Sequence, residues 1–168
     1  MPWPGAWPSH VLSESRQRLV GLRDIVSVLD TNTPSETEGA LTKFLVVRAC
    51  GHIEFTFDEA FCSLAESKAS PTVGNFVRSQ FFRGANPSAD RISQTLRKLD
   101  PSCAERFVLF AERDDSVVKR ELAFLIDRRN KIAHGQSETV GRRKALDLAA
   151  VALRVGDWLV TELNPRQV

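Results

Sequence analysis

The chain has 168 residues, of which 42% are hydrophobic and 26% are charged, and its formal net charge is +2. This composition is that of a globular chain able to bury a core, and the charge is too small to indicate nucleic-acid binding by itself. Without a run of about eighteen apolar residues, a membrane-spanning helix is excluded. The first eight residues lack the basic and apolar regions of a signal peptide. We therefore expect a cytoplasmic protein with no membrane partner.

Residues 1–8 contain three prolines and two tryptophans and predict a non-helical arm, packed on the rest of the chain or on a partner subunit. Residues 9–168 are predicted to form a single helical domain, because nearly every segment has the apolar spacing of an amphipathic helix. The first helix is expected from residue 9 or 13 to residue 29, and a long second helix from 34 to 67. Thr33 is the predicted N-cap of the second helix, with Glu36 closing a capping box.

Shorter helices are predicted next, at 72–82, 88–99 and 101–113, with start signals at Ser88 and Asp100. A helix at 115–133 should end at Gly135, and a last helix is expected at 139–163. Amphipathic helices joined by short polar turns must share one core. The sequence therefore predicts an all-α bundle of long antiparallel helices with short helices inserted between them.

The cysteines and histidines are too dispersed to form a local metal site. No CxxC pair is present, and we expect the cysteines to be buried, reduced thiols. The residues concerned are Cys50, Cys62, Cys103, His10, His52 and His134. The sequence thus predicts chemistry without a metal or cofactor.

The segment from Arg128 to Gly135 carries the residue types needed to hold a phosphodiester and move a proton beside it. A histidine such as His134 can accept a proton from a ribose 2′-hydroxyl or donate one to the leaving 5′-oxygen. Arg129 can pair with phosphate oxygens, and Asn130 can orient His134 or bind the phosphate. These groups would suffice for RNA cleavage that leaves a 2′,3′-cyclic phosphate. The alternative is that the cations simply suit the C-terminal end of a helix.

Five further basic residues lie close to this segment and predict a local field that attracts RNA phosphates. They are Arg128, Lys131, Arg142, Arg143 and Lys144. The alternative is that they form a solvated helix face.

Helical geometry places Arg129 and His134 on different faces of the helix. Asn130 and His134 are four residues apart and share a face, whereas Arg129 lies about 140° round the helix from His134. Either the last turn is distorted near Gly135, or two copies of the chain contribute groups jointly. The spacing therefore favours a dimeric site as one of two possibilities.

The string Arg129-Asn130-x-x-x-His134 resembles the motif of the HEPN superfamily, in which an arginine and a following polar residue precede a histidine. The motif ends the penultimate long helix, as in that superfamily, and the intervening helices resemble the RiboL-PSP-HEPN and MAE-like groups. The resemblance implies a homodimer with a composite cleft. It also implies a metal-independent endoribonuclease, acting as a toxin or phage-defence effector and restrained by an antitoxin or other regulatory partner.

In the roles implied by the resemblance, Arg129 and His134 are catalytic and Asn130 supports them. Members also place a polar or acidic residue of the earlier long helix near the motif, and Glu54 and Glu59 are candidates. Arg48 and His52 can join them, or all four can form ion pairs along their own helix. Two other functions remain open. One is a non-catalytic HEPN module that binds nucleotide or RNA or mediates assembly, and the other is a bundle used only for protein contact.

Overall fold

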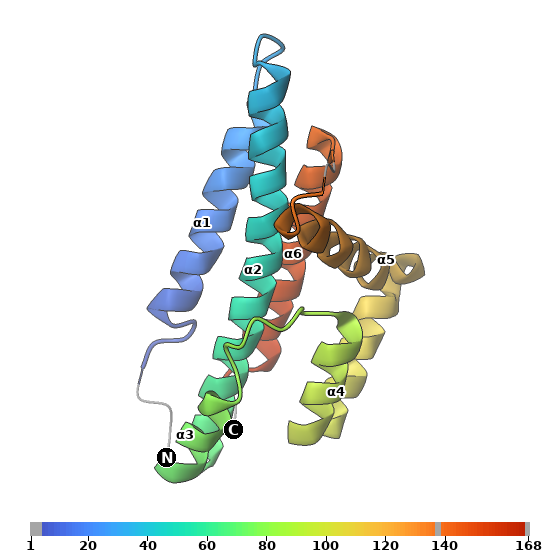
Figure 1. The fold of residues 1–168 in the computed structure, drawn as a ribbon. Helices are drawn as coiled ribbons and strands as arrows, with labels where there is room; N and C mark the ends of the chain where they lie inside the picture. The colour runs from blue at the N-terminus through green and yellow to red at the C-terminus, as the bar shows by residue number, and fades with distance from the viewer. Residues whose placement is uncertain (1–4, 137–138, 167–168) are drawn as a thin grey trace.

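The computed structural model describes residues 5–136 and 139–166, without the side chain of residue 114. In these ranges the chain is all-α, as predicted, and forms a helical bundle (Figure 1). Its six helices are α1 (His10–Ser27), α2 (Ser35–Lys68), α3 (Pro71–Ser79), α4 (Ala89–Leu99), α5 (Pro101–Ala133) and α6 (Arg142–Glu162). None of the helices in the described part is long and apolar enough to cross a membrane.

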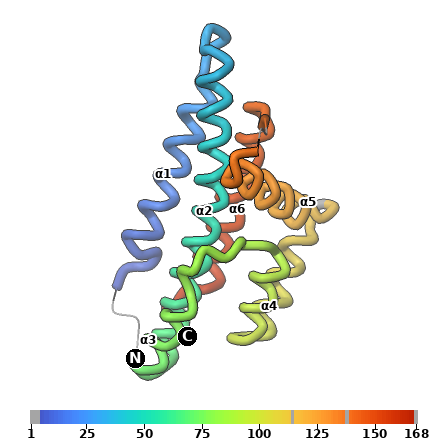
Figure 2. Tube along the Cα trace, viewed as in Figure 1, coloured from blue at the N-terminus to red at the C-terminus, as the bar shows by residue number. Residues whose placement is uncertain are grey.

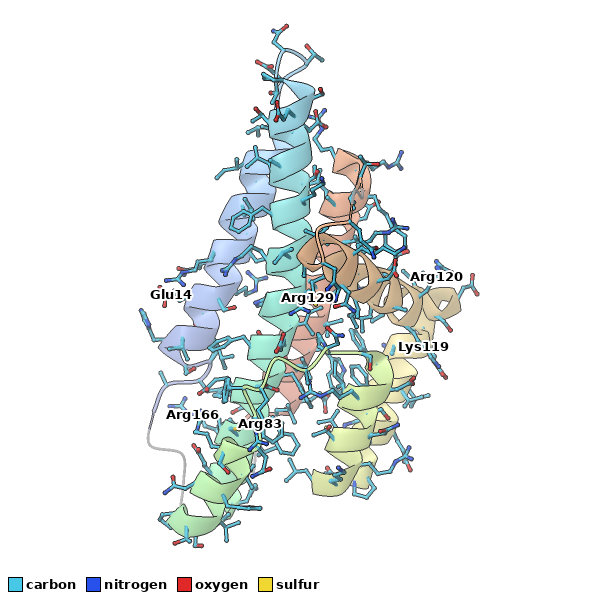
Figure 3. The ribbon with its side chains drawn as sticks, in the orientation of Figure 1. Glu14, Arg83, Lys119, Arg120, Arg129 and Arg166 are labelled. Atoms are coloured by element: carbon cyan, nitrogen blue, oxygen red, sulfur yellow. The ribbon has the colours of Figure 1, made fainter. Side chains whose placement is uncertain are left out.

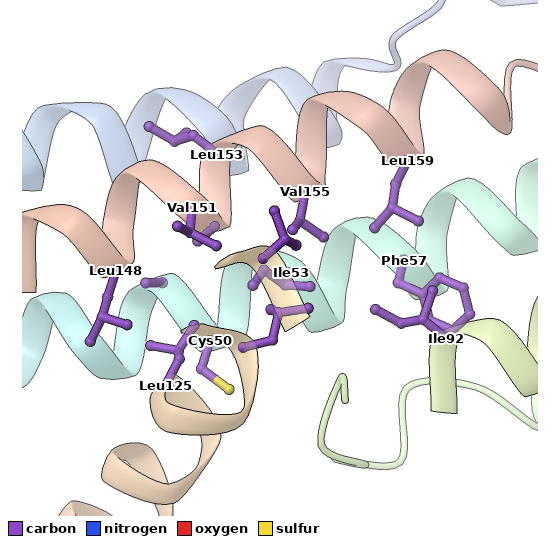
Figure 4. Close-up of a cluster of buried hydrophobic side chains, with 14 of the residues drawn as sticks. Cys50, Ile53, Phe57, Ile92, Leu125, Leu148, Val151, Leu153, Val155 and Leu159 are labelled. Atoms are coloured by element: carbon purple, nitrogen blue, oxygen red, sulfur yellow. The ribbon is translucent and has the colours of Figure 1, made fainter. Parts of the chain in front are cut away.

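Helix α2 is the centre of the bundle. It packs against α1, α3, α5 and α6, and α1 runs antiparallel to both α2 and α6 (Figure 1). Apolar residues of α2 and α6 interlock along much of their length, and side chains from α4 and α5 complete the core (Figure 4). A helix surrounded in this way must be apolar on several faces. Its buried residues include Leu45, Ile53 and Phe57, each fully inaccessible to solvent.

Helix α5 is sharply bent, and the bend decides where its C-terminal end lies. Asp115 and Ser116 have φ angles of 57° and 60°, in the left-handed region. The first arm of α5 packs beside α4, and the second arm crosses toward the middle of α2 (Figure 2). A straight helix of 33 residues would extend about 50 Å. The bend instead returns the end of α5 to the bundle. The sequence predicted two helices that meet at this point, and the structure has one bent helix there.

Two of the predicted helix starts are confirmed and one is wrong. The Ser88 hydroxyl accepts the Arg91 N–H, and the Asp100 carboxylate accepts the Ser102 N–H. Thr33 does not cap α2: the N-cap is Pro34, and no side-chain cap bond forms. The Thr33 hydroxyl lies instead 3.5 Å from Asp30 Oδ1, within the turn that precedes the helix.

Two other predicted boundaries shift. The helix predicted at 72–82 ends at Ser79, and the last helix begins at Arg142 rather than at residue 139. The predicted arm is described from residue 5 onward, and residues 1–4 lie outside the described residues. Trp7 of the arm donates its indole N–H to the Val160 carbonyl at 2.8 Å. This contact ties the arm to α6 of the same chain.

His52 lies where α1, α2 and α6 meet, and it is 5% exposed. Its Nδ1 is 2.9 Å from the Ser15 hydroxyl. Its Nε2 points at the backbone of α6, because a Cβ built on Gly156 would lie only 2.6 Å away. Within the described residues Nε2 has no hydrogen-bond partner. A neutral ring with its proton on Nδ1, donated to Ser15, leaves Nε2 as an unpaired acceptor, which costs less than burying a charged imidazolium.

This burial makes the stability of the fold depend on pH. Burial lowers the pKa of His52 to about 4, from 6.5 for the free side chain, and the nearby Asp157 carboxylate opposes the effect. Between pH 6.5 and about 4, His52 binds a proton in the unfolded chain but not in the folded chain. The free energy of unfolding should therefore fall as the pH drops from 6.5 toward 4, by about 3 kcal/mol from this residue.

Urea unfolding at a series of pH values checks this expectation. The variant His52→Gln should lose stability more slowly across the same interval, although carboxylates shared by both proteins also contribute. His10→Gln, which changes an exposed histidine at the start of α1, is the matched control. Parallel stability curves for the parent and His52→Gln would show that His52 does not supply the pH dependence.

Candidate active site

The end of α5 is fixed by a Schellman motif that includes the motif histidine. Gly135 has a φ of 69°, and its N–H bonds to the Ile132 carbonyl at 3.1 Å. The Gln136 N–H bonds to the Lys131 carbonyl at 3.0 Å, which completes the motif. His134 is the C-cap residue. The prediction that Gly135 ends the helix is confirmed, and the backbone of His134 is held in a defined position.

Arg129 and Asn130 contact each other directly. The Arg129 guanidinium donates to Asn130 Oδ1 at 3.1 Å, and both residues are half-buried. The Asn130 main-chain carbonyl accepts the His134 N–H at 3.0 Å. In this chain the amide side chain of Asn130 therefore orients Arg129, where the sequence had suggested an interaction with the His134 ring or with a phosphate.

Arg129 lies beside the middle of α2 (Figure 3). Its positive charge acts on two groups of α2, the Cys50 thiol and the Glu54 carboxyl. Burial raises the pKa of Glu54, and the Asp58 carboxylate raises it further, while Arg129 and Arg91 oppose the shift. Glu54 is thus a half-buried carboxyl within the electrostatic reach of the motif arginine.

The structure separates the polar residues of α2 that the sequence grouped as neighbours of the motif. Glu54 lies near Arg129, but Glu59 faces α3, where its carboxylate accepts a hydrogen bond from Arg78 at 3.0 Å. His52 turns toward α1 and α6, as described above. Arg48 is half-buried and acts electrostatically on His52. Glu54 is thus the candidate that the charge of Arg129 reaches, and its spacing within α2 gave no sign of that.

His134 is exposed and, within the described residues, its side chain forms no hydrogen bond or ion pair. Arg129, by contrast, is half-buried beside α2. The last turn of α5 remains helical through Ala133, so the angular separation of the two residues persists. A single chain therefore offers an oriented arginine and, on a different side, an exposed histidine.

Most of the basic residues near the motif interact with their own chain. Lys131 pairs with Asp127 at 3.1 Å, and Lys144 pairs with Glu121. Arg142 bonds to the Leu29 carbonyl and lies 3.7 Å from a carboxylate oxygen of Glu38.

Arg128 and Arg143 complete the basic set. Arg128 lies over the Phe124 ring at 4.6 Å from its centroid. Arg143 is exposed on the first turn of α6 and, in the part of the chain described, has no ion pair or hydrogen bond. Their role in RNA binding stays a prediction, and Arg143 is the most available of the five.

The cysteines are free and buried, as predicted. Burial raises the pKa of Cys50 and of Cys103 to about 11, and that of Cys62 to about 12, so all three are protonated thiols near neutral pH. Among the described residues, no three His, Cys, Asp or Glu side chains come together in a way that could hold a metal ion.

A long central helix beside the end of a bent helix that carries Arg129-Asn130-x-x-x-His134 defines a HEPN-type bundle. The family model described as RiboL-PSP-HEPN matches residues 13–164, a range that includes all six helices apart from the first residues of α1. The chain therefore belongs to the RiboL-PSP-HEPN family. No curated protein and no solved structure matches it significantly.

Proposed function

We propose that this protein is a metal-independent endoribonuclease whose catalytic residues are Arg129 and His134. The observation that carries the proposal is the arrangement at the end of α5. An arginine is oriented by Asn130 beside the Glu54 carboxyl, and a histidine is exposed at a backbone position fixed by hydrogen bonds. Together these residues supply a positive charge for a phosphate and a group that transfers protons.

In the proposed reaction, His134 accepts the proton of the ribose 2′-hydroxyl and returns it to the leaving 5′-oxygen. The 2′-oxygen forms a bond to phosphorus as the bond from phosphorus to the 5′-oxygen breaks. Arg129 pairs with the non-bridging oxygens, where negative charge develops. Asn130 positions Arg129, and the Glu54 carboxyl lies within reach of its charge. The products are a 2′,3′-cyclic phosphate and a 5′-hydroxyl, and DNA is resistant because it lacks the nucleophile.

We propose that the active enzyme is a homodimer in which Arg129 of one protomer and His134 of the other act on the same phosphate. The support is the different exposure of the two side chains within one chain: Arg129 is half-buried and His134 is exposed. In the cell, such an enzyme would act on RNA in the cytoplasm as a toxin or a phage-defence effector. A cognate antitoxin or regulatory protein would restrain it.

The test is incubation of purified protein with labelled RNA in the presence of EDTA, beside a DNA strand of the same sequence. The expected result is cleavage of the RNA alone, with 2′,3′-cyclic phosphate ends. Cleavage that EDTA abolishes would contradict the metal-independent mechanism. Fragments with 3′-hydroxyl ends would contradict attack by the 2′-hydroxyl.

The alternative function is a non-catalytic module that binds nucleotide or RNA or mediates assembly. It is favoured by the absence, within the described residues, of any partner that orients the His134 ring. Such a module would bind RNA without producing fragments, and binding would be equal in the parent and in His134→Ala.

A further inference from the structure

The loop between α3 and α4, residues 80–88, is held against α2 beside the candidate site (Figure 3). The Asp58 carboxylate, which is 1% exposed, accepts the Phe82 N–H at 2.9 Å. From the other side, the Arg91 guanidinium donates to the Ala85 carbonyl at 2.8 Å. Two anchors from two helices therefore fix the part of the loop between Phe82 and Ala85.

This part of the loop touches two consecutive residues of α2. A Cβ built on Gly84 would lie 4.0 Å from Glu54 Oε1, so the loop backbone borders the carboxyl on which the charge of Arg129 acts. The Phe82 ring lies 6.2 Å, centroid to centroid, from the ring of Phe55. Glu54 and Phe55 are consecutive on α2, and Phe82 lies two residues before Gly84 in the loop, so the aromatic pair lies close to the Glu54 carboxyl.

The backbone conformation and the exposure of Phe82 are both unfavourable for a residue with only a structural role. Its φ is 60°, a conformation that bulky residues rarely adopt. Its side chain is also 43% exposed, so the strained backbone is not offset by full burial of the ring. The anchors at Asp58 and Arg91 thus hold an aromatic ring at the surface, where it can meet a ligand.

The surroundings of this ring are charged. The Arg78 guanidinium, which is paired with Glu59 and Glu66, lies 5.7 Å from the Phe82 ring centroid. Phe55 also borders a hollow of about 300 Å³, which is lined by Arg48 and by an ion pair of Arg18 with Glu14. Arg48 forms no hydrogen bond or ion pair with the described residues. An aromatic pair beside an available arginine matches single-stranded nucleic acid, whose bases stack and whose phosphates are anionic, better than it matches an apolar protein surface.

We propose that Phe82 and Phe55 form a nucleobase subsite, in which the base of a nucleotide next to the scissile phosphate stacks on Phe82 while Arg48 contacts a neighbouring phosphate. This inference rests on the function proposed above, in either its catalytic or its RNA-binding form. It assigns to the loop before α4 the task of positioning single-stranded RNA beside Arg129.

The test uses Phe82→Gly in a His134→Ala background, so that the RNA stays intact. Glycine accepts a φ of 60° without strain, so the midpoint of thermal unfolding should not fall. The probe is a short single-stranded RNA with one 2-aminopurine, a base whose fluorescence is quenched by stacking. The expected result is affinity about tenfold weaker and a loss of quenching. Phe82→Trp should bind as the parent does.

Two further variants sharpen the result. Phe76→Ala removes another exposed phenylalanine, on α3, and should leave RNA binding unchanged. Arg48→Ala should weaken binding and reduce its dependence on salt concentration, with the quenching kept.

Two negative results distinguish failure of the proposed subsite from failure of the proposed function. Equal affinity and equal quenching in Phe82→Gly and its parent, beside a wild-type protein that cleaves RNA, would overturn the subsite and leave the proposed function intact. A folded wild-type protein that neither binds nor cleaves single-stranded RNA would overturn both.

Discussion

Replacing His134 with alanine is expected to reduce RNA cleavage by about 10²- to 10⁴-fold, the range of a lost general acid or base. The side chain is exposed and, within the described residues, forms no hydrogen bond or ion pair. Its removal should therefore change the free energy of unfolding by no more than about 0.5 kcal/mol. The measurement is the rate of RNA cleavage at matched concentrations of folded protein.

The matched control is His10→Ala, which removes another exposed histidine, at the start of α1. It should cleave RNA at the rate of the wild-type protein. Arg129→Ala should lose activity as His134→Ala does. Full activity of His134→Ala would remove this residue from the mechanism, whatever the effect of Arg129.

Mixing the two inactive variants tests whether the site is shared between protomers. If Arg129 and His134 of different protomers act together, a mixed dimer of Arg129→Ala and His134→Ala has one intact site and one doubly defective site. An equimolar mixture should then recover about a quarter of the wild-type rate, because half of the dimers are mixed. If both residues act within one chain, every site carries a defect and no activity returns.

Among the substitutions, the largest expected effect on stability is that of Gly156→Ala. The new methyl group would lie 2.6 Å from His52 Nε2 and 3.3 Å from its Cδ2. The ring is 5% exposed and is held through Nδ1 by Ser15, so it cannot move aside without losing that contact. We expect a loss of about 2–3 kcal/mol of unfolding free energy, despite the better helix propensity of alanine. Urea denaturation at neutral pH measures it.

Gly21→Ala is the matched control, because Gly21 is an exposed glycine inside α1 and a Cβ there would meet nothing within 4 Å. It should raise stability by about 0.5–1 kcal/mol. In a His52→Ala background, Gly156→Ala should cost much less, since the clashing ring is absent. Equal costs in the two backgrounds would mean that His52 is not the residue that requires glycine at position 156.

The helix boundaries that the sequence predicted correctly were set by local chemistry. Ser88, Asp100 and Gly135 each act on backbone groups within five residues, so their effect can be read from the adjoining sequence. Thr33 was wrongly predicted as the N-cap of α2, because a neighbouring side chain competes for its hydroxyl. Asp30 accepts the Asn32 N–H at 2.7 Å and lies near the Thr33 hydroxyl, so the turn takes the group that would have capped α2.

The partners of charged residues on α2 could not be predicted in the same way. Arg48, His52, Glu54 and Glu59 lie within about three turns of one helix, and their spacing shows only which of them share a face. Which neighbour each one meets depends on where the other helices pack. Glu54 lies near Arg129 because α5 bends at Asp115 and Ser116 and returns to α2. Glu59 meets Arg78 because α3 folds back along the end of α2.

By itself, then, the sequence determined the all-α class, the approximate helices and the motif Arg129-Asn130-x-x-x-His134, because these depend on periodicity and on short-range capping. The tertiary structure decided the contact of Asn130 with Arg129, the place of Glu54 beside them, the exposure of Phe82 and the fit of His52 against Gly156. The relations of Glu54 to Arg129 and of His52 to Gly156 join residues tens of positions apart in the chain. They form only when the core of α2 and α6 has brought the helices together, and no local pattern encodes them.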